Sequence, residues 1–327
     1  MNVKLALIIF AQICAISLSI PAETIAEYIS SEILVIPWGD GPDELGIREP
    51  YKEDIYVSED SSFEAWFASG GPDRGFVDVN DNIYFSSYEM FYIKGFHSDG
   101  QPFVNFSNQT QGSNHDLLGG AIENFYVDSD ARIFISNMLP FVVIADTLGN
   151  IIKRLIPPGY NEQMPVSLLF YEFDDELVIS ALNQIYIYRD DEFYEGGYPF
   201  WKASDGFYYR AKKYDESSFR FMKFETYDQI DTFYVAFDGN LYLGGLIGID
   251  LNDQFFIKYT EEEVDILLDV LILDSQFQEV DRFKILPEPE NQYMWYLNNS
   301  TFLRGDGNVY QFLCEDDGMH VIRWRKE

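Results

Sequence analysis

The stretch FVDVNDNIYF, residues 76–85, places a short turn of Asp and Asn residues between two apolar segments. Asp, Asn and Gly accept the positive φ angles that tight hairpin turns require, so this pattern predicts a β-hairpin. A similar stretch, FYVDSDARIFI, occupies residues 125–135. Weaker copies of the pattern lie at residues 169–179, 233–243 and 302–311. We predict a hairpin at each of these places.

A second repeated element indicates how long each unit is. Residues 142–152 align without gaps to residues 270–280, and residues 95–103 are a weaker relative. We interpret these stretches as the outer hairpins of four-stranded units. Gly100 and Gly149, which occupy equivalent turn positions, are 49 residues apart in the sequence. Asp146 and Asp274 are 128 residues apart, which is close to three units of about 43.

Four-stranded repeats of this length are typical of the blades of a β-propeller. For a chain of roughly 300 residues the period predicts an all-β, six-bladed β-propeller, with five or seven blades as alternatives. In the fourth unit, residues 206–212 and 218–225 look like strands without an Asp-Gly turn between them, and we interpret residues 243–270 as carrying an insertion. No Pro-, Gly- or Ser-rich linker interrupts the repeats, so we predict a single propeller domain over residues 20–327.

Composition agrees with a β-rich fold and narrows the range of partners. Aromatic residues make up 17% of the chain, and they favour pleated, half-buried surfaces. The formal net charge is −33, with a sequence pI near 4.2. Such a charge repels phosphate backbones, so we expect no nucleic-acid partner.

The N-terminus has the pattern of an export signal. One basic residue, Lys4, precedes an apolar run over residues 5–20, and small residues follow where a signal peptidase would cut. We predict a signal peptide over residues 1–19, cleaved near residues 19–22, with an uncleaved anchor as the alternative. The mature protein is then periplasmic, extracellular or on the cell surface, and has no membrane span. Of the two cysteines, only Cys314 remains after cleavage, so no intrachain disulfide forms.

Two parts of the chain resemble the six-bladed NHL-like propellers of exported bacterial proteins. They are the opening WGDGPDELG at residues 38–46, with Gly-Pro at residues 71–72, and the ending over residues 306–311 and 320–324. The resemblance implies a closed ring in which residues 32–36 complete the last blade. Most members of this group have no assigned activity, whereas some propellers that resemble this chain are calcium lactonases.

The turns are dense in carboxylates, which are ligands that Ca²⁺ prefers. The stretch DVNDN at residues 78–82 lacks the glycine and the later glutamate of a helix–loop–helix calcium site, and turn chemistry explains it without a metal. We therefore predict no metal site and no cofactor, with Ca²⁺ as the open alternative. We interpret His97 and His320 as surface or packing residues.

The densest aromatic segment suggests where a partner binds. From it we select Tyr198, Trp201 and Tyr208 as a ligand-binding patch, with packing between blades as the competing explanation. The sequence holds no catalytic motif of the kinds sought, including the Gly-x-Ser-x-Gly elbow. We expect a non-catalytic binding module that recognises a protein, peptide or glycan on one face. The alternative is a calcium-dependent, lactonase-like hydrolase with its site at the channel mouth.

Overall fold

The computed structural model describes residues 28–39, 41–46, 51–58, 61–67, 72–87, 92–107, 122–137, 141–158, 167–168, 177–181, 184–189, 191–195, 200–225, 228–261, 269–286, 301–315 and 317–327. All regular secondary structure within these ranges is β-strand. No helix there is long and apolar enough to cross a membrane. The predicted signal peptide, residues 1–19, and Tyr198 of the predicted patch lie outside the described residues.

The structure contains the following strands, given in chain order. They are β1 (Tyr28–Pro37), β2 (Tyr51–Ser58), β3 (Ser61–Phe67), β4 (Arg74–Val77), β5 (Ile83–Ser87), β6 (Tyr92–Phe96), β7 (Pro102–Ser107), β8 (Ile122–Val127), β9 (Ile133–Asn137), β10 (Val142–Ala145), β11 (Ile151–Leu155), β12 (Ser167–Leu168), β13 (Leu177–Ala181), β14 (Gln184–Arg189), β15 (Glu192–Glu195), β16 (Trp201–Lys202), β17 (Tyr208–Asp215), β18 (Ser218–Glu225), β19 (Asp228–Ala236), β20 (Leu243–Ile249), β21 (Phe255–Thr260), β22 (Asp269–Leu273), β23 (Glu279–Lys284), β24 (Thr301–Leu303), β25 (Val309–Glu315) and β26 (Gly318–Lys326).

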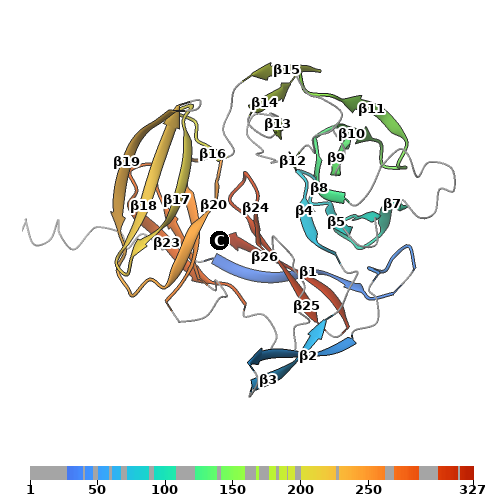
Figure 1. Cartoon of the computed structure of the whole chain (residues 1–327), viewed down its shortest axis with the longest axis horizontal. Helices are drawn as coiled ribbons and strands as arrows, with labels where there is room; N and C mark the ends of the chain where they lie inside the picture. The colour runs from blue at the N-terminus through green and yellow to red at the C-terminus, as the bar shows by residue number, and fades with distance from the viewer. Residues whose placement is uncertain are drawn as a thin grey trace, which may run out of the picture.

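Antiparallel pairing groups most of these strands into four-stranded sheets. Three sheets are built from consecutive strands, β4–β7, β8–β11 and β12–β15, and a fourth contains β24, β25, β26 and β1. An eight-stranded sheet contains β16–β19 and β20–β23, which join through the single pair Lys212↔Gly245. Figure 1 shows the sheets arranged around a common centre, with β4, β8, β12 and β24 toward the middle and β7, β11, β15 and β19 at the periphery. The fold is therefore all-β and propeller-like.

Strand β1 joins the two ends of the described chain. It pairs antiparallel with β26 from Tyr28↔Lys326 to Pro37↔Gly318, so the N-terminal strand completes a sheet whose other strands are the last in the sequence. The expectation that residues 32–36 complete the last sheet is confirmed.

Eight hairpin turns share one hydrogen-bond pattern. They occupy residues 78–82, 97–101, 128–132, 146–150, 203–207, 250–254, 274–278 and 304–308, and in each the first residue exchanges backbone hydrogen bonds with the fourth and the fifth. The fourth residue always has positive φ; it is glycine in four turns and Asp81, Ala131, Asp253 or Phe277 in the others. Five turns open with Asp, whose Oδ1 accepts hydrogen bonds from the N–H groups two and four residues later, as Asp78 does from Asn80 and Asn82 at 2.8 and 2.9 Å. The Asp and Asn residues that suggested hairpins thus stabilise the turns directly.

The hairpin predicted at residues 233–243 is wrong. Strand β19 pairs with β18 and β20 pairs with β21, so this segment connects two four-stranded units. Its N–H groups bond elsewhere: Phe237 donates to the Ser217 carbonyl and Leu241 to the Glu216 carbonyl, each at 2.8 Å. The predicted insertion over residues 243–270 contains the missing hairpin, β20–β21.

Aromatic side chains fill the spaces between neighbouring sheets. Phe76 of β4 packs edge-to-face on Phe302 of β24 at 5.2 Å and on Phe125 of β8 at 6.2 Å. Tyr28 of β1 stacks on Phe283 of β23 at 4.5 Å. The high aromatic content therefore supplies the contacts between sheets.

Candidate functional site

The eight Asp-rich turns lie toward one end of their sheets, which we call the turn face. In a sheet of four antiparallel strands the first and third turns share an end, and neighbouring sheets are held together there. Arg304 pairs with Asp81 across two sheets, and the Ser204 N–H donates to Asp253 Oδ1 at 2.8 Å across the two halves of the eight-stranded sheet. Arg304 also pairs with Asp306 of its own turn. These contacts give the turn face a fixed geometry.

A cavity of about 240 Å³ opens between the sheets β8–β11 and β12–β15. We call it the inter-sheet pocket. Its lining residues are Tyr126, Asp128, Ser129, Asp130, Arg132, Phe134, Leu177, Tyr188, Arg189 and Asp191. Because the turn at residues 128–132 forms one wall, the pocket belongs to the turn face.

Apolar side chains form the floor of the inter-sheet pocket. Tyr126, Phe134, Leu177 and Tyr188 are all buried. Phe134 packs edge-to-face on Tyr188 across the two sheets, with ring centroids 6.1 Å apart, and the centroids of Tyr126 and Phe134 are 6.0 Å apart. Since these rings are fixed by the core on both sides, the floor needs little rearrangement to receive a ligand.

Charged groups form the rim and are paired with one another. Arg132 Nε lies 2.6 Å from Asp128 Oδ2. The Tyr188 hydroxyl donates to Asp191 Oδ1 at 2.6 Å, and Lys153 Nζ lies 3.3 Å from the same carboxylate. The hydrogen bond from Tyr188, followed by that from Lys153, lowers the pKa of Asp191. Burial, and then Asp191, raise the pKa of Tyr188, so this phenol stays protonated and serves as a neutral donor.

The rim thus presents both hydrogen-bond donors and acceptors above an aromatic floor. Asp130 and Asp191 keep exposed side chains, at 78% and 63%, so their remaining lone pairs face solvent. Arg132 is 38% exposed and keeps donors beyond the Nε that meets Asp128. This arrangement suits a small polar ligand that contacts the aromatic floor and hydrogen-bonds to the charged rim.

The structure places two residues of the patch predicted from sequence. Trp201 is half-buried in β16 and packs against a core cluster, and Tyr208 in β17 is 7% exposed. Tyr208 packs with Met222 and Phe224, so its ring faces the protein's own core and not solvent. The register pairs Trp201 with Tyr209 and Lys202 with Tyr208, which brings the two predicted residues onto adjacent strands. As a binding surface the patch stays a prediction, and the competing packing role fits Tyr208.

Sequence reasoning missed the inter-sheet pocket. The sequence predicted the hairpin turn at residues 128–132, which forms one wall of the pocket. Tyr188 and Asp191 belong to another unit, and no sequence motif links them to this turn. Elsewhere on the turn face the carboxylates act as the turn interpretation predicts: Asp78 Oδ2 accepts from Asn82 Nδ2 at 2.8 Å and from the Tyr84 hydroxyl at 3.1 Å.

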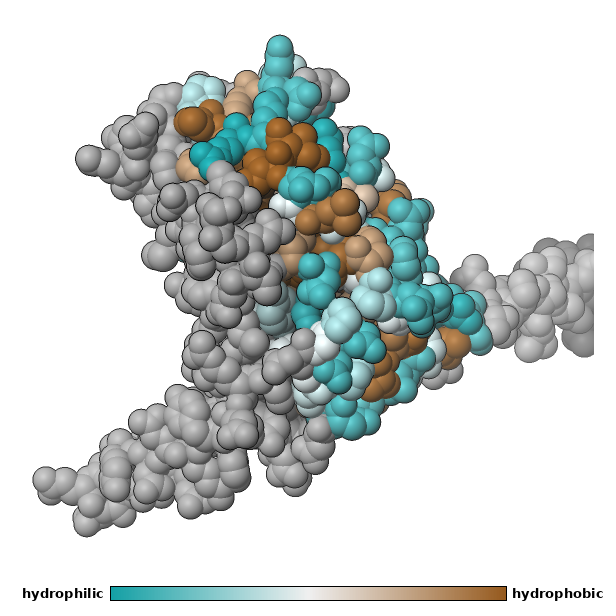
Figure 2. Space-filling view, turned by 90° about the vertical axis from the view of Figure 1, so that its right-hand side faces the viewer, coloured by the Kyte–Doolittle hydropathy of each residue, from teal (hydrophilic) through white to brown (hydrophobic). Residues whose placement is uncertain are grey.

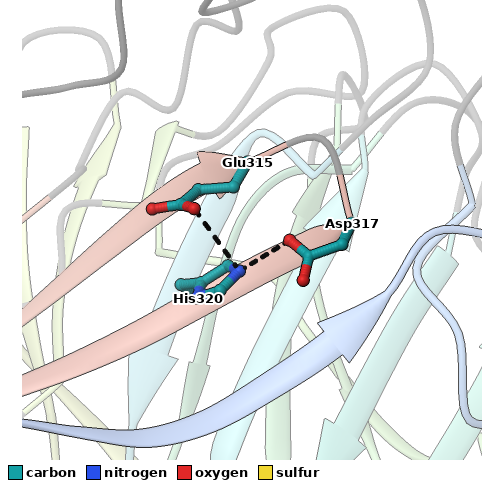
Figure 3. Close-up of side chains that lie close together, drawn as sticks. All are labelled: Glu315, Asp317 and His320. Atoms are coloured by element: carbon teal, nitrogen blue, oxygen red, sulfur yellow. Dashed lines mark hydrogen bonds and ion pairs between the residues drawn. The ribbon is translucent and has the colours of Figure 1, made fainter.

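A separate cluster of titratable groups lies at the tip of the β25–β26 hairpin. Figure 3 shows Glu315, Asp317 and His320 turned toward one another, with His320 Nε2 2.8 Å from Asp317 Oδ1 and 3.8 Å from Glu315 Oε2. His320 Nδ1 lies 2.7 Å from Glu32 Oε2 of β1. Burial alone would lower the pKa of His320, but Asp317 and Glu32 raise it. Within the described residues this is the group of His, Asp and Glu side chains close enough to share one ion.

The remaining described surface is mixed in character. On the side shown in Figure 2, hydrophobic residues form several separate patches between hydrophilic ones. Exposed aliphatic side chains include Leu148, Ile152 and Ile156, on or beside β11.

Comparison with known proteins finds structural likeness without sequence relatives. No family model matches the chain, and no curated protein is similar enough to count as a relative. Similar solved structures include a member of the DUF4221 family from Bacteroides vulgatus, at 12% identity and a TM-score of 0.44 over 88% of this chain and 99% of that one. The WD40 β-propeller domain of Doa1 matches at 11% identity and a TM-score of 0.41, over 92% of this chain and 96% of that one. Virginiamycin B lyase from Staphylococcus aureus matches at 11% identity and a TM-score of 0.41, over 82% of each chain. At this level of similarity we transfer neither ligands nor site residues from them.

Proposed function

We propose that the protein is an exported six-bladed β-propeller that binds a neutral glycan in the inter-sheet pocket. The eight-stranded sheet counts as two blades, because a single residue pair joins its halves while each half pairs along several residues. The other four-stranded sheets then supply the remaining blades. Export rests on the signal predicted at residues 1–19.

One observation carries the choice of ligand: the pocket combines an aromatic floor with a rim of paired charges. Sugars present an apolar ring face and an edge of hydroxyl groups, each of which both donates and accepts hydrogen bonds. Tyr126, Phe134 and Tyr188 supply the apolar base. Asp130 and Arg189 supply acceptors and donors at the edge of the cavity. A cavity of about 240 Å³ has room for one sugar ring of a longer chain.

The local charge favours a neutral ligand over a basic peptide. The whole chain has a net charge of −33. Around this cavity, however, Asp128, Asp130 and Asp191 are balanced by Arg132, Arg189 and the neighbouring Lys153. A site that attracted a basic peptide would retain the excess of carboxylates found on the rest of the chain. Nucleic acid stays disfavoured by the same net charge, and the calcium-dependent hydrolase stays an untested alternative.

Binding of neutral trisaccharides tests this proposal. We expect the full chain to bind at least one of maltotriose, cellotriose, mannotriose and triacetylchitotriose, measured by isothermal titration calorimetry. Asp130→Asn and Arg189→Gln should each weaken that binding by roughly 10- to 100-fold, the loss typical of one hydrogen bond to a charged group. Both side chains lie on the rim, so the melting temperature should change little.

A matched control comes from another turn of the same kind. Asp99 occupies the same turn position as Asp130 but belongs to the sheet β4–β7, outside the cavity, and its Oδ1 accepts from the Gln101 N–H at 3.1 Å. Asp99→Asn keeps that acceptor and should bind the trisaccharide as the wild type does. The proposal fails if no trisaccharide binds, or if Asp130→Asn and Asp99→Asn weaken binding equally. If oligolysine binds in preference to the trisaccharides, the proposed ligand becomes a basic peptide and not a glycan.

A further inference from the structure

We propose that Glu315, Asp317 and His320 bind one divalent transition-metal ion, for which Zn²⁺ is the reference, and that the ion fastens the β25–β26 hairpin to β1. The site lies at the end of the sheet opposite the turn face, because the β25–β26 turn is the second turn of its sheet. It is independent of the proposed glycan site.

The three side chains offer donors at nearly the spacing that one ion requires. Zinc bonds to histidine nitrogen and carboxylate oxygen at about 2.0–2.2 Å, which puts neighbouring donors of a tetrahedral site about 3.3 Å apart. His320 Nε2 lies 2.8 Å from Asp317 Oδ1 and 3.8 Å from Glu315 Oε2, and all three donor atoms lie within 4.8 Å of one another. Small rotations of the exposed Glu315 and Asp317 side chains reach the required spacing.

Glu32 provides an independent observation that points to a metal. It comes from β1, 288 residues away from His320 in the chain, and its carboxylate meets His320 Nδ1 at 2.7 Å. A carboxylate that holds the Nδ1–H leaves Nε2 as the nitrogen whose proton a metal ion displaces, and this is the arrangement found behind histidines that bind metals. The imidazole side chain is only 12% exposed, so its orientation is fixed before an ion arrives.

Charge and access agree with this assignment. Three carboxylates surround one imidazole, so the cluster keeps excess negative charge even when His320 is protonated, and a divalent ion neutralises it. Glu315 and Asp317 are 44% and 72% exposed, which leaves a path for the ion and room for water to complete its coordination. A nitrogen donor favours Zn²⁺ and its neighbours over Ca²⁺, which takes oxygen ligands.

The hairpin that carries the donors is already held against β1. Trp38 Nε1 donates to the Glu315 carbonyl at 2.7 Å. Gly318 pairs with Pro37, and a side chain at Gly318 would collide with the Ile36 carbonyl. An ion on His320 polarises the imidazole and strengthens its hydrogen bond to Glu32, so metal binding tightens the closure of the ring.

Metal titration of the chelator-treated full chain tests the proposal. We expect isothermal titration calorimetry to show saturable binding of one equivalent of Zn²⁺, with a melting temperature several degrees higher at a hundredfold excess over the dissociation constant. Ca²⁺ at the same concentrations should give neither signal. Asp317→Asn and His320→Gln should abolish Zn²⁺ binding, and Glu32→Gln should weaken it roughly 10- to 100-fold.

His97 offers the matched control. Its Nδ1 lies 2.8 Å from Asn82 Oδ1 and its ring stacks on Phe103, away from the hairpin-tip cluster. His97→Gln should bind Zn²⁺ as the wild type does. Asp317→Asn changes a largely exposed side chain and serves if His320→Gln fails to fold. The proposal is overturned if the wild type does not bind Zn²⁺, if binding survives Asp317→Asn in folded protein, or if Ca²⁺ replaces Zn²⁺ equally well.

Discussion

Asp250, the first residue of its turn, is 1% exposed and yet carries a carboxyl group. Burial raises the pKa of this group, with the nearby Asp253 adding to the shift, although hydrogen bonds from the Gln254 and Asn252 N–H groups oppose it. The same N–H groups, at 2.8 and 2.9 Å from Oδ1, explain why an acceptor is needed there. The turn requires the Asp250 oxygen as a hydrogen-bond acceptor, whereas burial of the negative charge destabilises the folded protein.

Asp250→Asn is therefore expected to stabilise the protein at pH 7. A raised pKa means that the folded chain binds this proton more tightly than the unfolded chain does. The wild type thus loses stability as pH rises from the unfolded pKa through the folded one. Asn keeps the acceptor and removes the charge, so we expect a gain of up to about 1 kcal/mol at pH 7 and no gain near pH 3. Urea denaturation at the two pH values measures this, and an equal effect at both would contradict it.

The hairpin turn is the element that the sequence reveals most clearly. Its Asp, Asn and Gly residues act within five positions of one another, so the pattern in the chain is the pattern of hydrogen bonds. The same signal misled at residues 233–243, where Asp-Gly-Asn lies in a loop between units and is tied to the turn between β17 and β18. Asp, Asn and Gly residues predict that the chain turns at a given place, but they do not predict which strands pair on either side of the turn.

Turn geometry makes a prediction about Ala131. It adopts φ of 59° at the position where glycine stands in four other turns. Ala131→Gly should stabilise the protein by about 0.5–1 kcal/mol, because the cost of a left-handed alanine exceeds the entropy that glycine adds to the unfolded chain. Denaturant unfolding checks the sign. A loss of stability would show that the turn does not strain this residue.

Two glycine turns give the reverse test. Gly206 has φ of 83° and nothing lies within 4 Å of an added Cβ, so Gly206→Ala should cost about 1 kcal/mol from the backbone alone. Gly307 has φ of 84°, and its added Cβ would lie 3.1 Å from Asp250 Oδ2. Gly307→Ala should therefore cost more than Gly206→Ala in the same measurement. Equal losses would mean that the Asp250 carboxylate moves aside without cost.

At the scale of the whole molecule, β1 decides whether the ring is closed. Its residues Tyr28 and Ile36 are buried, the Tyr28 ring stacks on Phe283, and the Tyr28 hydroxyl donates to the Gly307 carbonyl at 3.0 Å. One strand thus connects the last sheet to β23 of the preceding unit and to the turn face. Closure of this kind joins the first and the last described strands in one sheet.

A chain that starts after residue 37 should lose several kcal/mol of stability, since it lacks the backbone pairing of β1 with β26 and two buried side chains. We expect a broad, early melting transition and rapid cleavage by protease. The matched control starts at Tyr28 and keeps β1, so it should melt as the full chain does. Equal melting of the two truncated chains would contradict a closing role for β1.

Sequence alone determined the features that depend on neighbours in the chain. These are the strand-forming aromatic segments, the Asp-rich turns and the all-β class, each a consequence of side chains acting within a few residues. Tertiary structure alone decided which side chains meet. Tyr188 and Asp191 face the turn at residues 128–132 because two sheets pack together there, and Glu32 reaches His320 because the first strand pairs with the last. No local pattern records such contacts, since the packing of sheets sets those distances.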